Sequence, residues 1–147
     1  MADGQLFADD VVEGDDLPAL RTTFTTRDLA MFAGAAADFY EIHYDRDFAR
    51  ERGLDGVIVH GALKHALLGR FLHQWVAPAG RIASYSCSYR GMDAPGEELV
   101  CRGTVTGVSR QADGTSLVDV DIRVEKADGS VTTPGRGRVV LPHRALA

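Results

Sequence analysis

The sequence is poor in cysteine and in basic charge, and it lacks any long apolar run. Cys87 and Cys101 are its two cysteines, and we expect buried free thiols, although the two fall on neighbouring predicted strands and could approach each other. With 16 Lys and Arg against 21 Asp and Glu, the chain has a net charge of −5 and lacks the basic stripe of a nucleic-acid-binding protein. No segment approaches the roughly 20 apolar residues of a membrane span. We therefore expect a cytoplasmic protein that binds neither nucleic acid nor membranes.

The length of the chain fits one domain with a single continuous core. Residues 1–16 are acidic and carry few large apolar side chains, so we expect a flexible lead-in there and one domain over residues 17–147. Thr25 or Thr26 can cap a helix that begins at Arg27 and ends just before Asp38. A second, shorter helix is expected from Arg46 to Arg52, with Asp45 as its cap and Gly53 as its terminator.

A long buried helix is predicted over residues 61–76, because apolar side chains recur there at intervals of three and four over more than half of the circumference. After residue 80 the apolar period changes to two, which predicts antiparallel strands separated by turns such as Asp113-Gly114 and Asp128-Gly129. We therefore predict an α+β fold in which a curved antiparallel sheet, formed as a meander, wraps around the long central helix. The expected strands are 82–89, 98–108, 117–124 and 131–141, with earlier extended segments at 20–24 and 57–59.

Asp38 and His43 are the first candidates for chemistry. They stand five residues apart in a segment that leaves one helix before the next begins. In such a loop a carboxylate and an imidazole can hold one water between them and move its proton, which is typically worth about 10²–10⁴ in rate. The spacing is not a metal-binding signature. A capping aspartate and a packed loop histidine would have the same spacing, so the residues alone leave both interpretations open.

Gly61 opens the long helix directly after an apolar run. A glycine there lets another group approach the backbone amide, and the N-terminus of a helix favours negative charge. A carbonyl docked on that amide would be stabilised as it becomes an enolate. A glycine that only permits tight packing is the structural alternative.

The stretch Ala37-Asp38-Phe39-Tyr40-Glu41-Ile42-His43-Tyr44-Asp45, followed by Val59-His60-Gly61, resembles the motif of the MaoC-like (R)-specific enoyl-CoA hydratases and dehydratases, which have the hotdog fold. The resemblance covers about half of the chain, from Phe32 to roughly Gly103. It implies a hydro-lyase that adds water to, or removes it from, an acyl thioester. It also implies that Asp38 and His43 are the acid–base pair and that the Gly61 amide is the oxyanion donor.

Two departures from the family motif affect the substrate. Ala37 stands where the family commonly has glycine, and Tyr40-Glu41 replace a common Asn-Pro, so the acyl pocket is expected to be reshaped. We assign Tyr40, Glu41, His60 and Ala62 to substrate binding, while His60 could equally be structural. Lys64, together with several arginines, is read as a solvated surface cation, with coenzyme A phosphates as the alternative.

The resemblance implies no metal and no separate cofactor, because coenzyme A or an acyl carrier protein would arrive as part of the substrate. One sheet of this kind exposes an edge, so we expect a homodimer or a dimer of dimers, with a heteromer that contains a second hotdog subunit as the other option. Two alternative functions are a hotdog thioesterase, in which water attacks the carbonyl, and a non-catalytic acyl-CoA-binding subunit. Retention of Asp38, His43 and Gly61 together argues against the binding subunit.

Overall fold

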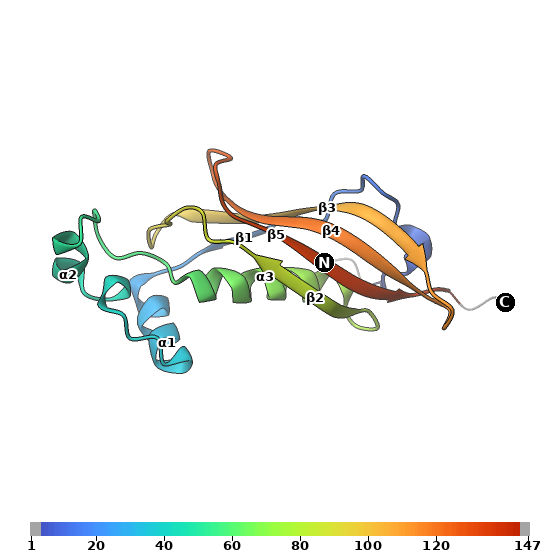
Figure 1. Cartoon of the computed structure of the whole chain (residues 1–147), viewed down its shortest axis with the longest axis horizontal. Coiled ribbons are helices and arrows are strands. Elements are labelled where there is room, and N and C mark those ends of the chain that lie inside the picture. Colours follow the sequence, from blue (N-terminus) through green and yellow to red (C-terminus); the bar gives the residue numbers. More distant parts are fainter. Residues whose placement is uncertain (1–3, 145–147) are drawn as a thin grey trace.

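The computed structural model describes residues 4–144, which form one five-stranded antiparallel sheet curled around a long helix (Figure 1). This is the expected α+β architecture. Within the described residues, no helix is both long enough and apolar enough to cross a bilayer. In chain order the elements are the 3-10 turn η1 (Ala8–Asp10), strand β1 (Leu20–Thr23), helix α1 (Thr26–Ala36), the 3-10 turn η2 (Glu41–His43), helices α2 (Arg46–Glu51) and α3 (Gly61–Val76), and strands β2 (Arg81–Cys87), β3 (Glu98–Arg110), β4 (Thr115–Lys126) and β5 (Val131–Pro142).

The strand order is β1-β3-β4-β5-β2. Strands β3, β4 and β5 form the expected meander, and Gly114 and Gly129 provide the positive φ angles of its two turns. Strand β2 was expected to precede β3 in this meander, but it pairs with β5 at one edge of the sheet. Residues 88–97 carry the chain from that edge, past β5 and β4, to the start of β3. Cys87 and Cys101 therefore lie on strands separated by β4 and β5, and both are free thiols. Burial raises the pKa of Cys101 to about 12.

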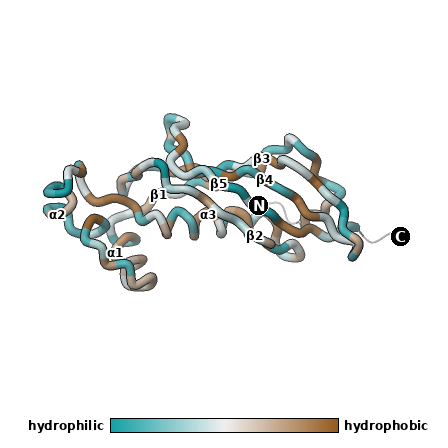
Figure 2. Tube along the Cα trace, in the orientation of Figure 1, coloured by the Kyte–Doolittle hydropathy of each residue, from teal (hydrophilic) through white to brown (hydrophobic). Residues whose placement is uncertain are grey.

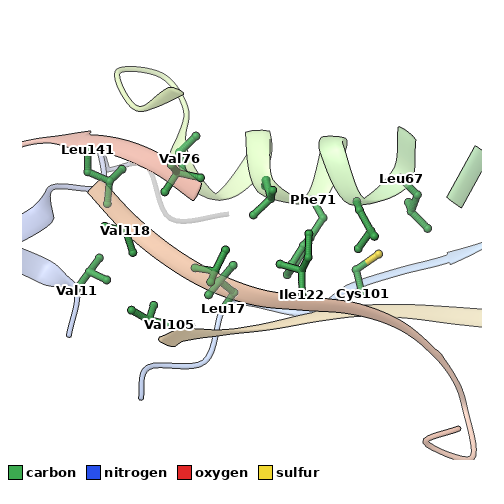
Figure 3. Close-up of a cluster of buried hydrophobic side chains, with 14 of the residues drawn as sticks. Val11, Leu17, Leu67, Phe71, Val76, Cys101, Val105, Val118, Ile122 and Leu141 are labelled. Carbon is green, nitrogen blue, oxygen red and sulfur yellow. The ribbon is translucent and has the colours of Figure 1, made fainter. Parts of the chain in front are cut away.

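The core lies between α3 and the inner face of the sheet (Figure 3). Leu67, Phe71 and Val76 point from α3 toward Ile122 and Leu141 on the strands, and all five side chains are buried. Burial of each such side chain contributes roughly 1.5–3 kcal/mol. The predicted bounds of this helix, 61–76, agree with the structure.

The described part of the expected lead-in, residues 4–16, packs against β3 instead of extending away from the domain. Ala8 and Val11 are buried in the core, and the Gly14 amide donates to the Val105 carbonyl at 2.9 Å. The Leu17 amide donates to the Gly103 carbonyl at 2.9 Å. A few small apolar residues are therefore enough to anchor this segment, while most of its acidic residues stay exposed. Residues 1–3 lie outside the described part.

Helices α1 and α2 lie together beyond the first residue of α3 (Figure 1). The start of α1 is a reciprocal cap, in which the Thr25 amide donates to the Asp28 carboxylate at 2.7 Å and the Asp28 amide donates to the Thr25 hydroxyl at 3.3 Å. Asp45 caps α2 as expected, since its carboxylate accepts from the Asp47 and Phe48 amides. This end of the molecule places the candidate residues at the N-terminus of α3.

Residues 57–59, which join α2 to α3, form a hydrophobic stretch that Figure 2 shows in brown. They were expected to be a buried strand end but are an extended connection outside the sheet. The Ile58 amide donates to the Ile42 carbonyl at 3.1 Å, and the Val59 amide donates to the Asp93 carbonyl at 2.8 Å. These two neighbouring amides therefore bond to two different segments of the chain. Because neither segment pairs with more than one of them, no strand ladder forms.

Candidate active site

Asp38 is placed by the end of α1. Ala37 ends the helix in the left-handed region, with φ of 54°, and the Asp38 amide donates to the Ala33 carbonyl at 3.0 Å. The Asp38 side chain is half-buried. The turn at Ala37 therefore directs the chain away from the helix and fixes the backbone position of Asp38.

His43 closes the short turn η2 and is only 7% exposed. Its Nδ1 lies 2.8 Å from the Ile58 carbonyl oxygen. A carbonyl can only accept, so Nδ1 carries the hydrogen and donates. The Nε2 atom is then the one left to exchange a proton.

His60, the residue before α3, is fully buried and stacks on His43 with ring centroids 3.8 Å apart and planes 20° from parallel. The ring of Phe32 also packs against His60 in an edge-to-face arrangement, with ring centroids 5.0 Å apart. Neither ring nitrogen of His60 has a hydrogen-bond partner among the described residues. Burial lowers the pKa of His60, the neighbouring His43 lowers it further, and Asp38 opposes both effects. His60 is therefore held in its neutral form.

Asp38, His43 and His60 each contribute a polar atom to a group whose members lie within 4.8 Å of one another. This is a set of residues that can hold a metal ion, so the arrangement of the rings matters. The two stacked rings lie in nearly parallel planes. Nδ1 of His43 is bonded to the Ile58 carbonyl, so Nε2 is the nitrogen of His43 that can exchange a proton or bind an ion.

Gly61 is the first residue of α3, so its amide has no partner within the helix. A Cβ built on Gly61 would lie 2.8 Å from two ring carbons of Tyr89. The sequence predicted that another group approaches the backbone closely at this glycine. In the structure that group is the Tyr89 ring, and it approaches the α-carbon. Tyr89 is 55% exposed, so its ring forms part of the surface beside the helix start.

The other predicted site residues are placed differently. The rings of Tyr40 and His43 are nearly perpendicular, with centroids 6.4 Å apart, and Tyr40 is 48% exposed. Glu41 and Ala62 are exposed, and neither belongs to the Asp38–His43–His60 group. His60 has no exposed surface.

Sequence reasoning missed Tyr89, Lys64 and Asp93. Lys64 was expected on the surface but is 2% exposed, and its Nζ lies 2.6 Å from the Asp93 Oδ2 atom. The signal was present, because Lys64 precedes Leu67 and Leu68 by three and four residues and so shares their buried face. Nothing local in the sequence marks Tyr89 or Asp93 as neighbours of α3.

Comparison with known proteins decides the family. The profile described as MaoC like domain matches residues 11–128. The chain belongs to the MaoC-like family. The solved MaoC-like dehydratase of Rhodospirillum rubrum is 25% identical, with a TM-score of 0.83 over 96% of this chain and 99% of that one. This similarity confirms the hotdog fold.

Two curated relatives of this MaoC-like chain differ greatly in length. The (R)-specific enoyl-CoA hydratase of Aeromonas caviae is 27% identical over 124 residues, which cover 84% of this chain and 90% of that protein. The fatty acid synthase subunit beta of Aspergillus oryzae is 29% identical over 131 residues, which cover 80% of this chain but only 6% of the subunit. The MaoC-like chain thus spans a small part of the fungal subunit and nearly all of the bacterial enzyme.

Proposed function

We propose that this chain is a hydro-lyase that adds water across the α,β double bond of an enoyl thioester, or removes it from the 3-hydroxyacyl thioester. The observation that carries the proposal is His43, whose Nδ1 is bonded to the Ile58 carbonyl while its ring lies beside Asp38 at the start of α3. That arrangement leaves one imidazole nitrogen and one carboxylate for proton exchange. Membership in the MaoC-like family supports the same reaction class.

In the proposed mechanism, the Asp38 carboxylate and the Nε2 atom of His43 hold the water. The pair takes one proton from the water as the C3–O bond forms, and the π electrons move onto the thioester oxygen to give an enolate. The Gly61 amide, at the positive end of α3, stabilises that oxygen. The proton then returns to C2, so the hydrogen and hydroxyl of one water are both added.

Tyr40 and Tyr89 are proposed to shape the substrate site, since both are exposed beside the catalytic group. A surface hollow of about 760 Å³ borders the site, because Ile58, whose carbonyl accepts from His43, lines it together with Asp93. Coenzyme A or a carrier protein would bring the acyl group as part of the substrate.

A second hotdog chain is proposed to complete the site. Strand β2 is an edge strand, and on its outer side its seven residues pair with no other strand of the described chain. A copy of this chain, or a related subunit, can pair there. Light scattering on the purified protein tests this, with a dimer or tetramer expected, and a monomer would direct the search to a co-purifying subunit.

The experiment for the function follows the ultraviolet absorbance of enoyl-CoA thioesters of several chain lengths, with a thiol reagent in parallel. Loss of the conjugated band without thiol release is expected. Thiol release would show a thioesterase instead. No change with any substrate, for a protein shown to be folded and assembled, would count against the proposed activity on coenzyme A thioesters.

A further inference from the structure

Lys64 and Asp93 form an ion pair that is removed from solvent. The Lys64 side chain is 2% exposed and that of Asp93 is not exposed at all, and their charged atoms lie 2.6 Å apart. The same ammonium also donates to the Gly91 carbonyl at 2.8 Å. Two buried charges cost desolvation energy, and an apolar pair of similar size is often as stable. The pair therefore calls for a role other than stability.

The backbone of Asp93 connects this pair to His43. The Asp93 carbonyl accepts from the Val59 amide at 2.8 Å, and the next residue toward the N-terminus is Ile58. The Ile58 carbonyl accepts from Nδ1 of His43 at 2.8 Å, and the Ile58 amide donates to the Ile42 carbonyl at 3.1 Å. Residues 58–59 thus bridge Asp93 on one side and the His43 loop on the other.

Lys64 also links this bridge to the helix start. Its amide donates to the His60 carbonyl at 3.2 Å, while its side chain holds residues 91 and 93. The Arg90 and Gly91 amides both donate to the Thr132 carbonyl on β5 at 2.9 Å. The loop that carries Asp93 is therefore held between the sheet and the first turn of α3.

We propose that Lys64 and Asp93 are positioning residues, which fix residues 58–59 and so hold His43 in one orientation with its hydrogen on Nδ1. They act through His43 and not on the substrate. The positioning itself is a structural claim about His43, while its effect on rate rests on the proposed hydro-lyase function. Without the pair, the Ile58 carbonyl is free to shift, and His43 gains access to the other tautomer.

The test uses two variants, one that removes a single charge of the pair and one that removes both. Asp93→Asn keeps the shape of the side chain but leaves Lys64 without its counter-charge. The double variant Lys64→Met, Asp93→Leu replaces both charges by apolar groups. It leaves no unpaired charge in the core, so it is expected to fold even where the single variant does not. Asp119→Asn is the matched control, because Asp119 and Arg138 form a 2.7 Å pair at the exposed face of β4 and β5.

Two readouts separate positioning from folding. Nitrogen-15 NMR of the histidine rings, with His43 assigned by comparison with His43→Gln, is expected to show the Nδ1–H form in the wild type and in Asp119→Asn. A mixture of tautomers is expected in both pair variants. In the enoyl-CoA assay, kcat is expected to fall by about 10–100-fold with KM within about threefold, as for a misplaced catalytic group.

A folded double variant in which His43 keeps the Nδ1–H form would overturn the proposal, whatever its activity. If the wild type hydrates no enoyl thioester but the pair variants still shift the tautomer, the positioning role stands and the proposed function fails. If the tautomer shifts and kcat is unchanged in an active enzyme, the pair positions His43 without catalytic effect, and that part of the proposal is wrong.

Discussion

The imidazole rings of His43 and His60 lie face to face, with centroids 3.8 Å apart and planes 20° from parallel. Two protonated rings at this separation would repel each other. Burial and the neighbouring His43 lower the pKa of His60, so His60 stays neutral in the folded chain. The stack therefore places a neutral His60 against His43, and polar atoms of Asp38 and of both histidines lie within 4.8 Å of one another.

The lowered pKa of His60 predicts a pH dependence of stability. In the unfolded chain His60 takes up a proton below its ordinary pKa of about 6.5, while the folded chain resists protonation, so the free energy of unfolding should fall as the pH drops below that value. His60→Phe, which keeps the stacked ring but cannot titrate, should flatten this dependence. Urea unfolding of both proteins between pH 5 and 8 measures it. Equal pH dependence in the two proteins would show that His60 is not the group responsible.

Carboxylates contribute in a separate and more acidic window. Hydrogen bonds from the Arg144 backbone and from His143 lower the pKa of Asp9 to about 2. The stability from such a group is present above the ordinary aspartate pKa of about 4 and is lost as the pH falls toward 2. Measurements above pH 5 therefore isolate the histidine effect.

Gly61→Ala is predicted to destabilise the protein by about 1–3 kcal/mol, because the added methyl overlaps the Tyr89 ring. Adding Tyr89→Ala to this variant should recover most of the loss. Gly34→Ala is the control, since a Cβ at Gly34, in the last turn of α1, meets nothing within 4 Å. That change should stabilise by roughly 0.5–1 kcal/mol. Chemical unfolding measures all of these variants, and a neutral Gly61→Ala would contradict the packing.

The role of the Gly61 amide can be separated from that packing. Gly61→Pro with Tyr89→Ala removes the N–H, and the first position of a helix tolerates proline. Gly61→Ala with Tyr89→Ala keeps the N–H on the same relieved background. We predict that kcat of the proline variant is about 10²–10³-fold below that of the alanine variant. Equal rates in two folded variants would rule out this amide as the oxyanion donor.

Ala37→Gly is predicted to stabilise the chain by about 0.5–1 kcal/mol. Ala37 has a φ of 54°, a conformation that costs an L-residue about 1–2 kcal/mol, and glycine recovers this at a smaller cost in unfolded-state entropy. Ala36→Gly, within the last turn of α1, should destabilise by up to about 1 kcal/mol. Thermal and urea unfolding compare the two. A loss of stability in Ala37→Gly would contradict the left-handed turn.

Local pattern predicted the elements of this fold better than their pairing. The bounds of α3 follow from side-chain spacing, and capping chemistry predicted Thr25 or Thr26 as the cap of α1, which is Thr25; both signals act within a few residues. The pairing of β2 with β5 depends on the path of residues 88–97, and no local signal sets that path. Residues 57–59 have the composition of a strand, but their amides are taken by Ile42 and Asp93.

In the candidate site, too, the local sequence predicted individual residues better than the contacts between distant segments. The spacing of Asp38 and His43 allowed a common site without requiring one, and the resemblance to the MaoC-like family supplied the rest of the hypothesis. The stacking of His60 on His43 and the Tyr89 ring over Gly61 are contacts between segments far apart in the sequence. Such contacts appear only once the chain is folded.

The most direct test of the central claim is a cycle of Asp38→Asn, His43→Gln and the double variant, measured as kcat/KM for an enoyl-CoA that the wild type hydrates. If the two residues hold and move the proton of one water, each single change should lower kcat/KM by about 10²–10⁴, and the double variant should lose little more than the worse single. Independent losses that multiply in the double variant, or a folded Asp38→Asn with wild-type activity, would contradict the account.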